Sequence, residues 1–134
     1  MALADVPMTG ERILIVDDNA MSVKLAAYLM RARGYDVTIA VDAEAALDAI
    51  ALQHPDVVLM DIQLPGIDGL ELVRRLRADV TSQHLLIIAV TAYAMKGDQE
   101  RALAAGCDGY ITKPIDTRAL PEAIALHLAG RRMS

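Results

Sequence analysis

The sequence predicts an α/β fold, a doubly wound sheet of five parallel strands with five helices. Short aliphatic runs, typical of buried parallel strands, alternate along the chain with longer segments whose apolar residues recur at helical spacing. The chain of 134 residues has the size of one domain, and its 54% hydrophobic content without Phe or Trp indicates an aliphatic core. Because strand-to-strand crossovers are right-handed, few other arrangements of five such units are possible.

Each element has a local justification. In chain order we expect a strand at 13–18, a helix at 20–33, a strand at 37–41, a helix at 43–53, a strand at 57–61, a helix from Leu70, a strand at 85–90, a helix at 96–106, a strand at 109–112 and a last helix after Asp116. Gly34 follows the first helix where a C-terminal cap is expected. Asp42 can cap the alanine-rich second helix, which His54-Pro55 ends.

The second half of the chain has less regular signals. The turn-rich stretch 64–69 leads into the third helix, whose apolar residues are three apart. The segment 96–106 has Leu103 as its only large aliphatic residue, so its burial energy should be small and we expect it to be the most mobile element. Asp116 can cap the last helix, but Pro121 lacks an N–H for a helix interior, so this helix should begin late or irregularly.

Composition limits the classes of function. Residues 1–11 are expected to be a poorly ordered lead-in, 12–130 the folded domain and 131–134 a tail. The 13 Lys and Arg against 18 Asp and Glu give a net charge of -5, which argues against nucleic acid as a partner. No apolar run approaches the roughly 18 residues of a membrane span, and no targeting segment precedes the domain. The single Cys107 suits a reducing cytoplasm, where we expect the protein to act.

Four of the aliphatic runs end in charged or hydroxyl side chains. These are Asp17 and Asp18 after the first run, Asp61 in VVLMD, Thr91 in LIIAVT and Lys113 in YITK. The carboxyl ends of parallel strands lie along one edge of a sheet, where open α/β sheets bind their ligands. Taken singly, each residue has an ordinary structural explanation as a cap, loop or surface residue, but four independent accidents would not fall at the same end of separate strands.

Three carboxylates that converge must be neutralised. Protons could do so, which would raise their pKa values, or a hard divalent cation could, and Mg²⁺ takes one or two carboxylates together with waters and phosphate oxygens. A carboxylate beside Mg²⁺ can attack a phosphoryl group to form an aspartyl phosphate. A lysine ammonium and a threonine hydroxyl are suitable donors to the phosphoryl oxygens.

The four motifs together resemble a known family. ILIVDDN, LMDIQLPGIDGLEL, IIAVTAYAMKGD and AAGCDGYITKPI are similar, in this order, to the receiver domain of two-component response regulators, over residues 12–128. Single-domain regulators and the receivers of hybrid histidine kinases are both similar. The resemblance implies a flavodoxin-like receiver topology and a phosphoprotein that works in signal transduction.

The resemblance also implies roles for individual residues. Asp61 would be the phosphorylated residue, Asp18 and Asp61 would bind Mg²⁺ with the backbone carbonyl of Gln63, and Asp17 would help through water. Thr91 and Lys113 would contact the phosphoryl group. The Lys113-Pro114 peptide is expected to be cis, as in many receivers.

A switch is implied as well. The family couples Thr91 to an aromatic residue on the fifth strand, here Tyr110, and so changes the surface made by the fourth helix, fifth strand and fifth helix. Gln63 and Tyr93 occupy positions that influence the loss of the phosphoryl group to water. We hypothesise that the bulky ring of Tyr93 shields the site and lengthens the phosphoryl lifetime, so that Tyr93→Ala would shorten it.

Other classes fit less well. A haloacid dehalogenase-like phosphatase also uses an Asp nucleophile and Mg²⁺, but it has a second acid where this chain has Gln63, and the reverse order of motifs. A nucleotide or flavin module would need a glycine-rich or hydroxyl-rich loop after the first strand. A histidine phosphotransfer protein would be a helical bundle, which the strand pattern opposes.

Within the receiver class two roles stay open. The chain could be a freestanding regulator that acts through a downstream protein target, or a phosphate-shuttle module, including the detached receiver of a hybrid histidine kinase. We expect no enzymatic activity beyond phosphorylation and dephosphorylation at Asp61, and no attached output domain. The partner would be a histidine kinase or a histidine phosphotransfer protein, which we expect to dock beside the first helix, near Asn19, Ser22 and Arg31.

Overall fold

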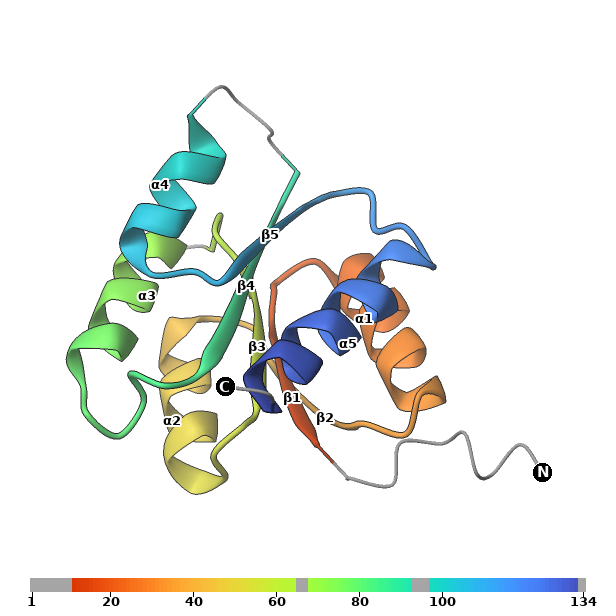
Figure 1. Cartoon of the computed structure of the whole chain (residues 1–134), viewed down its shortest axis with the longest axis horizontal. Coiled ribbons are helices and arrows are strands. Elements are labelled where there is room, and N and C mark those ends of the chain that lie inside the picture. The colour runs from red at the N-terminus through yellow and green to blue at the C-terminus, as the bar shows by residue number, and fades with distance from the viewer. Residues whose placement is uncertain (1–10, 65–67, 93–96, 133–134) are drawn as a thin grey trace.

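The computed structural model describes residues 11–64, 68–92 and 97–132. Five parallel strands form one sheet in the order β2-β1-β3-β4-β5, and helices cover both of its faces (Figure 1). The strands are β1 (Arg12–Val16), β2 (Asp36–Ala40), β3 (Val57–Asp61), β4 (Leu86–Thr91) and β5 (Gly109–Thr112), and the helices are α1 (Ala20–Ala32), α2 (Ala43–Leu52), α3 (Gly69–Ala78), α4 (Asp98–Ala105) and α5 (Ala119–Arg132). This is the doubly wound, flavodoxin-like arrangement of five parallel strands and five helices that the sequence predicts, so the predicted fold class is confirmed.

The sheet separates two aliphatic cores. On one face α1 and α5 pack against the sheet through residues such as Met30 and Ile124 (Figure 1). On the other face α2, α3 and α4 bury residues such as Ile50, Val73 and Ala102. The residues of β3 and β4 are buried throughout, because each of these central strands has a neighbour on both sides and helices above and below.

Most element boundaries agree with the predicted ones to within a residue or two. Gly34 has φ +88° directly after α1, a conformation that glycine adopts without the steric cost of a side chain. The Asp42 carboxylate accepts the N–H of Ala45 at 2.8 Å and so caps α2. Val41 was predicted in the second strand, but β2 ends at Ala40 and Val41 is 56% exposed.

Helix α4 is held by little apolar surface, as predicted. Its buried residues are Asp98, Ala102 and Ala105, whereas Leu103 points outward and is 46% exposed. The helix begins at Asp98, after Gly97 at φ +89°, and Lys96, the first residue of the predicted segment, lies outside the described part of the chain. Its expected mobility stays a prediction.

Helix α5 begins late, as Pro121 required. The Asp116 carboxylate accepts the N–H groups of Arg118 and Ala119, and α5 starts at Ala119. Pro121 is therefore the third residue of the helix, within the first turn, where its missing N–H would have no partner inside the helix. The expected lead-in lies almost wholly outside the described residues, and the domain limits 12–130 stay a prediction.

Candidate functional site

The sheet brings the predicted polar residues to one edge. Asp17 directly follows β1, Asp61 and Thr91 are the last residues of β3 and β4, and Lys113 directly follows β5. Since β1, β3, β4 and β5 are neighbours in this order, Asp61 lies between the acidic pair on one side and Thr91 and Lys113 on the other. The expected convergence of these side chains at the carboxyl edge is thus observed.

The three carboxylates form a cluster. Asp17, Asp18 and Asp61 can each offer one oxygen so that all three atoms lie within 4.8 Å of one another. Asp17 and Asp61 are buried, each 5% exposed, whereas Asp18 is exposed. The cluster therefore has two carboxylates in a poorly solvated environment and a third that faces solvent.

Lys113 bridges the two buried carboxylates. Its Nζ lies 3.0 Å from Asp17 Oδ2 and 3.3 Å from Asp61 Oδ2, and its side chain is 13% exposed. The Lys113 backbone N–H donates to the carbonyl of Thr91 at 2.7 Å, which ties the end of β5 to the end of β4. The predicted cis peptide between Lys113 and Pro114 is present.

The other oxygen of each buried carboxylate accepts a backbone N–H. Asp17 Oδ1 accepts from Asn19 and Asp61 Oδ1 accepts from Gln63, both at 2.9 Å. These bonds fix the carboxylates in short turns where the chain leaves the strands. Each carboxylate thus uses Oδ1 to define its own orientation and Oδ2 to contact the lysine.

Burial and charge shift two pKa values. Desolvation by burial raises the pKa of Asp61, the Gln63 N–H and the Lys113 charge oppose this, and the Asp17 charge adds to it. Burial by itself would lower the pKa of Lys113, but its hydrogen bonds and charge interactions with Asp17 and Asp61 raise it. Lys113 is therefore charged at neutral pH, and one ammonium faces three carboxylates.

This excess of negative charge suits a hard cation. Carboxylate oxygens are the ligands that Mg²⁺ prefers, and two of the three in this cluster come from rigid strand ends. The donor set fits Mg²⁺ better than a soft metal, because among the described residues the cluster contains neither His nor Cys.

Thr91 and Tyr110 lie behind this cluster. Thr91 is fully buried at the end of β4. Tyr110 on β5 packs against the core beneath α2, α3 and α4, and its hydroxyl is buried without a hydrogen-bond partner among the described residues. Gln63 is exposed beside Asp61, and Tyr93, to which we assigned a shielding role, lies outside the described residues.

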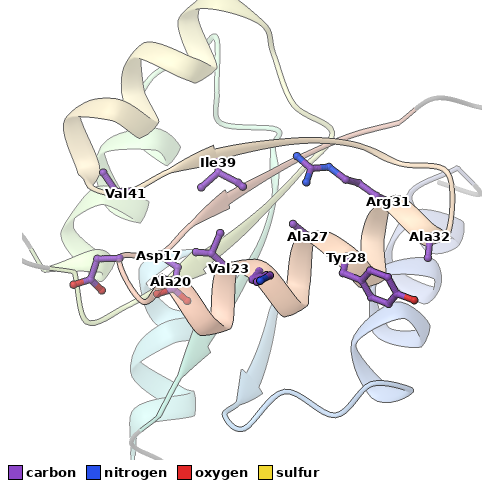
Figure 2. Close-up of a pocket in the computed structure, with 11 residues that line it drawn as sticks. Asp17, Ala20, Val23, Ala27, Tyr28, Arg31, Ala32, Ile39 and Val41 are labelled. Carbon is purple, nitrogen blue, oxygen red and sulfur yellow. The ribbon is translucent and has the colours of Figure 1, made fainter.

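An apolar groove leads away from the acidic cluster. It runs between α1 and the edge strand β2, with Asp17 at one end and Tyr28, Arg31 and Ala32 at the other (Figure 2). Its volume is about 800 Å³, and Val23 and Ala27 of α1 face Ile39 across it. This groove was not predicted from the sequence. Aliphatic residues such as Ile39 that point outward from a strand indicate a groove only when the strand is known to lie at the edge of the sheet.

The sequence matches the family described as response regulator receiver domain over residues 13–125. It is 44% identical over 116 residues to the polar-differentiation response regulator DivK of Brucella ovis, a match that covers 87% of this chain and 94% of that relative. DivK of Brucella anthropi is 43% identical over the same coverage. The resemblance to single-domain DivK-type regulators is thereby confirmed.

Solved structures agree with the sequence relatives. A CheY-like receiver domain protein from Methanospirillum hungatei superposes with a TM-score of 0.84 at 33% identity, covering 92% of this chain and 97% of that chain. The receiver domain of the sensor histidine kinase PA1611 from Pseudomonas aeruginosa has a TM-score of 0.77 at 36% identity, with coverages of 85% and 93%. That structure has a magnesium ion coordinated in its active site cleft.

Proposed function

The chain belongs to the response regulator receiver domain family, and we propose that it is a single-domain response regulator of a two-component phosphorelay. A phosphohistidine of a partner protein donates its phosphoryl group to Asp61. A carboxylate oxygen of Asp61 attacks the phosphorus, the phosphorus–nitrogen bond breaks, and the electron pair of that bond remains on the imidazole of the donor.

One observation carries this proposal: Asp61 shares a cluster with Asp17 and Asp18, and Lys113 Nζ contacts both Asp17 and Asp61. The three carboxylates suit a cation, and the ammonium beside Asp61 is a suitable partner for phosphoryl oxygens. Phosphoryl transfer depends mainly on positioning and on the neutralisation of these oxygens. Thr91, at the end of the neighbouring strand, is the proposed hydroxyl donor.

Asp18, Asp61 and the carbonyl of Gln63 would hold Mg²⁺, with Asp17 acting through a bound water. When bound, the cation neutralises oxygens of the incoming phosphoryl group. Asp17 and Asp61 keep their orientation through the backbone N–H groups of Asn19 and Gln63. Lys113, which contacts Asp17 and Asp61, would balance the remaining charge.

The test is incubation with acetyl phosphate and Mg²⁺, followed by intact-mass measurement of wild type and Asp61→Asn. We expect one phosphoryl adduct on wild type, none on Asp61→Asn, and none on either protein when EDTA replaces Mg²⁺. An adduct that persists in Asp61→Asn would assign the chemistry to another residue. Asp68→Asn is a matched control, because Asp68 caps α3 and is not part of the cluster.

We propose that the phosphohistidine donor, a histidine kinase or a histidine phosphotransfer protein, docks on the exposed side of α1. Asn19, Ser22 and Arg31 lie on this helix or at its start, and the groove of Figure 2 joins the helix surface to Asp17 and Asp18. A donor on this face can reach the cluster without passing over the rest of the sheet edge.

This docking is tested with a double variant, Asn19→Ser with Ser22→Arg. The serine at residue 19 keeps a side-chain oxygen that can cap α1. We expect transfer from a phosphorylated donor to fall, while labelling by acetyl phosphate stays at the wild-type rate. Val80→Arg, an exposed position near the end of α3, is the control. Unchanged transfer in the double variant would rule out this face.

The output of the proposed switch is a downstream protein target. Phosphorylation favours one of two conformations to the extent that its contacts differ between them. Thr91 would move toward the phosphoryl group, Tyr110 would respond, and the surface of α4, β5 and α5 would change. The weak burial of α4 supports this, because a helix held mainly by two alanines is displaced at small cost.

A phosphate-shuttle role is the alternative within the family, favoured by the likeness to the receiver of the PA1611 histidine kinase. Phosphoryl transfer from Asp61 back to a phosphotransfer protein distinguishes it from a terminal regulator. Membership of the receiver family argues against the haloacid dehalogenase-like phosphatase. No helix in the described part of the chain is long and apolar enough to cross a membrane; the cytoplasmic location stays a prediction.

A further inference from the structure

We propose that Gly69 is a positioning residue for the candidate site, because only a residue without a side chain lets the start of α3 lie against the backbone that follows Asp61. The expected effect on phosphorylation rests on the proposed function, whereas the close contact between Gly69 and the backbone after Asp61 does not depend on it. Gly69 is the first residue of α3, directly after the capping residue Asp68.

The space at Gly69 is closed by backbone atoms. A Cβ built on Gly69 would lie 2.5 Å from Ile62 Cα, 2.8 Å from the carbonyl oxygen of Asp61 and 2.9 Å from the carbonyl carbon of Ile62. No side-chain rotation relieves such contacts, so either α3 or the chain at Asp61 and Ile62 must move. The Gly69 N–H also donates to the Ile62 carbonyl at 3.2 Å, which holds the two segments together.

The backbone conformation does not explain this glycine. A positive φ, which favours glycine, is found at Gly34, Gly97 and Gly106. Gly69 does not have a positive φ, because it is part of helix α3. Glycine is among the least favourable residues in a helix. Close approach to the residues after Asp61 is therefore the reason that the chain has glycine at this position.

The elements on both sides of this contact are held in place, and Ile62 is tied to β4 because its N–H donates to the Val90 carbonyl at 3.2 Å. β3 is paired with β1 and β4, and α3 is anchored by Leu72 and Val73, which are fully buried. The chain between them begins with Ile62 and Gln63, and the Gln63 N–H orients the Asp61 carboxylate at 2.9 Å. A side chain at residue 69 would thus displace the backbone at Gln63, which carries both this N–H and the carbonyl proposed as a Mg²⁺ ligand.

The test compares Gly69→Ala with two controls. Val73→Ala creates a cavity on the same helix and destabilises the fold without adding an atom against the backbone of Asp61 and Ile62. Gly130→Ala adds a methyl group in a helix where a Cβ would meet nothing within 4 Å. For each protein we would measure unfolding by urea, Mg²⁺ affinity by calorimetry, the rate of labelling by acetyl phosphate, and the Gln63 amide resonance and its hydrogen exchange without metal.

We expect Gly69→Ala to bind Mg²⁺ about tenfold more weakly, as when a residue that orients a metal ligand is changed. Its labelling should slow, and the Gln63 amide should shift and exchange faster in the metal-free protein. Val73→Ala should lose stability but keep the wild-type site. Gly130→Ala should keep the wild-type site and be somewhat more stable than wild type, because alanine is favoured over glycine in a helix.

The proposal would be overturned if Gly69→Ala behaved like Val73→Ala, that is, if it lost stability but kept the wild-type Mg²⁺ affinity, labelling rate and Gln63 amide. If it does not fold alone, it is made in the Gly130→Ala background and measured in sucrose, which strengthens burial; failure to fold even then contradicts a positioning role. Should wild type accept no phosphoryl group at all, the proposed function fails, while Mg²⁺ affinity and the Gln63 amide still decide the role of Gly69.

Discussion

Lys113→Met should destabilise the metal-free protein and at the same time strengthen its binding of Mg²⁺. Methionine keeps the length and apolar stem of the lysine but removes the ammonium that bridges Asp17 and Asp61. Two buried carboxylates then face each other without a counter-charge. The same loss removes a cation that competes with Mg²⁺ for these oxygens.

The magnitude follows from the geometry. At the Nζ to Oδ2 distances of 3.0 and 3.3 Å, Coulomb attraction at an effective dielectric constant of about 20 is about 5 kcal/mol for each contact. Desolvation of the ammonium cancels much of this, and the removal of one partner from a buried pair typically costs about 3–5 kcal/mol. We therefore expect the free energy of unfolding at pH 7 to fall by about 3 kcal/mol in EDTA.

Urea unfolding followed by circular dichroism, in EDTA and in saturating Mg²⁺, measures both effects. Because a ligand at about 100 times its dissociation constant adds about 2.7 kcal/mol to stability, Mg²⁺ should restore most of the loss in Lys113→Met. Lys24→Met is the matched control, since Lys24 is exposed on α1 and should leave stability unchanged. A Lys113→Met protein as stable as this control in EDTA, or one that binds Mg²⁺ more weakly than wild type, would refute the reasoning.

Three further predictions concern the same edge and its supports. The pKa of Asp61 is raised, which means that the folded state binds the Asp61 proton more tightly than the unfolded state does. In EDTA, wild type should therefore lose stability relative to Asp61→Asn as the pH rises from 3.8 through the pKa of Asp61 in the folded protein. Urea unfolding of both proteins at several pH values checks this. Tyr110→Phe should raise the free energy of unfolding by about 1 kcal/mol, since it removes a buried hydroxyl that has no hydrogen-bond partner among the described residues, and a lower melting temperature would contradict it. Arg77→Lys should lower the free energy of unfolding in urea by about 2 kcal/mol, because a lysine ammonium cannot reproduce the planar guanidinium of Arg77. That guanidinium donates to three backbone carbonyls and one carboxylate, those of Gln83, Leu85, Gly106 and Asp108. The control Arg75→Lys, on the exposed side of the helix, should change the free energy of unfolding little.

The sequence was sufficient for the strands and for the residues at their ends. Runs such as Val57–Asp61 are recognisable because a parallel strand that is buried on both faces consists of consecutive apolar residues, without the alternation of apolar and polar residues that marks a half-exposed strand. Once the strands are parallel, chain direction alone places Asp61 and Thr91 at one edge. That these residues also come close to one another depends on the strand order, in which β1, β3, β4 and β5 are neighbours.

Contacts between backbone and distant side chains could not be predicted in this way. Arg77 has the position of an ordinary basic residue near a helix end, yet it holds three carbonyls and a carboxylate from the β4 and β5 side of the fold. Gly69 was part of a turn-rich stretch, and only the packing of α3 against Ile62 shows why it lacks a side chain. Val41 was placed in a strand because alternation continues one residue beyond the last pair of the ladder.

The position of Lys113 suggests how a chemical change at Asp61 would reach the rest of the sheet. In the proposed reaction Asp61 becomes an acyl phosphate, so the oxygen that now lies 3.3 Å from Nζ loses its charge and the new charge lies on the phosphoryl oxygens. Lys113 stays protonated and keeps its contact with Asp17 at 3.0 Å, but its second contact can shift from Asp61 to the phosphoryl oxygens. Its backbone N–H is bonded to the Thr91 carbonyl at 2.7 Å, so movement of the lysine strains the junction of β4 and β5. Tyr110 lies on β5, three residues before Lys113, and its buried hydroxyl has no hydrogen-bond partner in the described part of the chain. It is therefore the side chain on that strand with least to lose by changing its position.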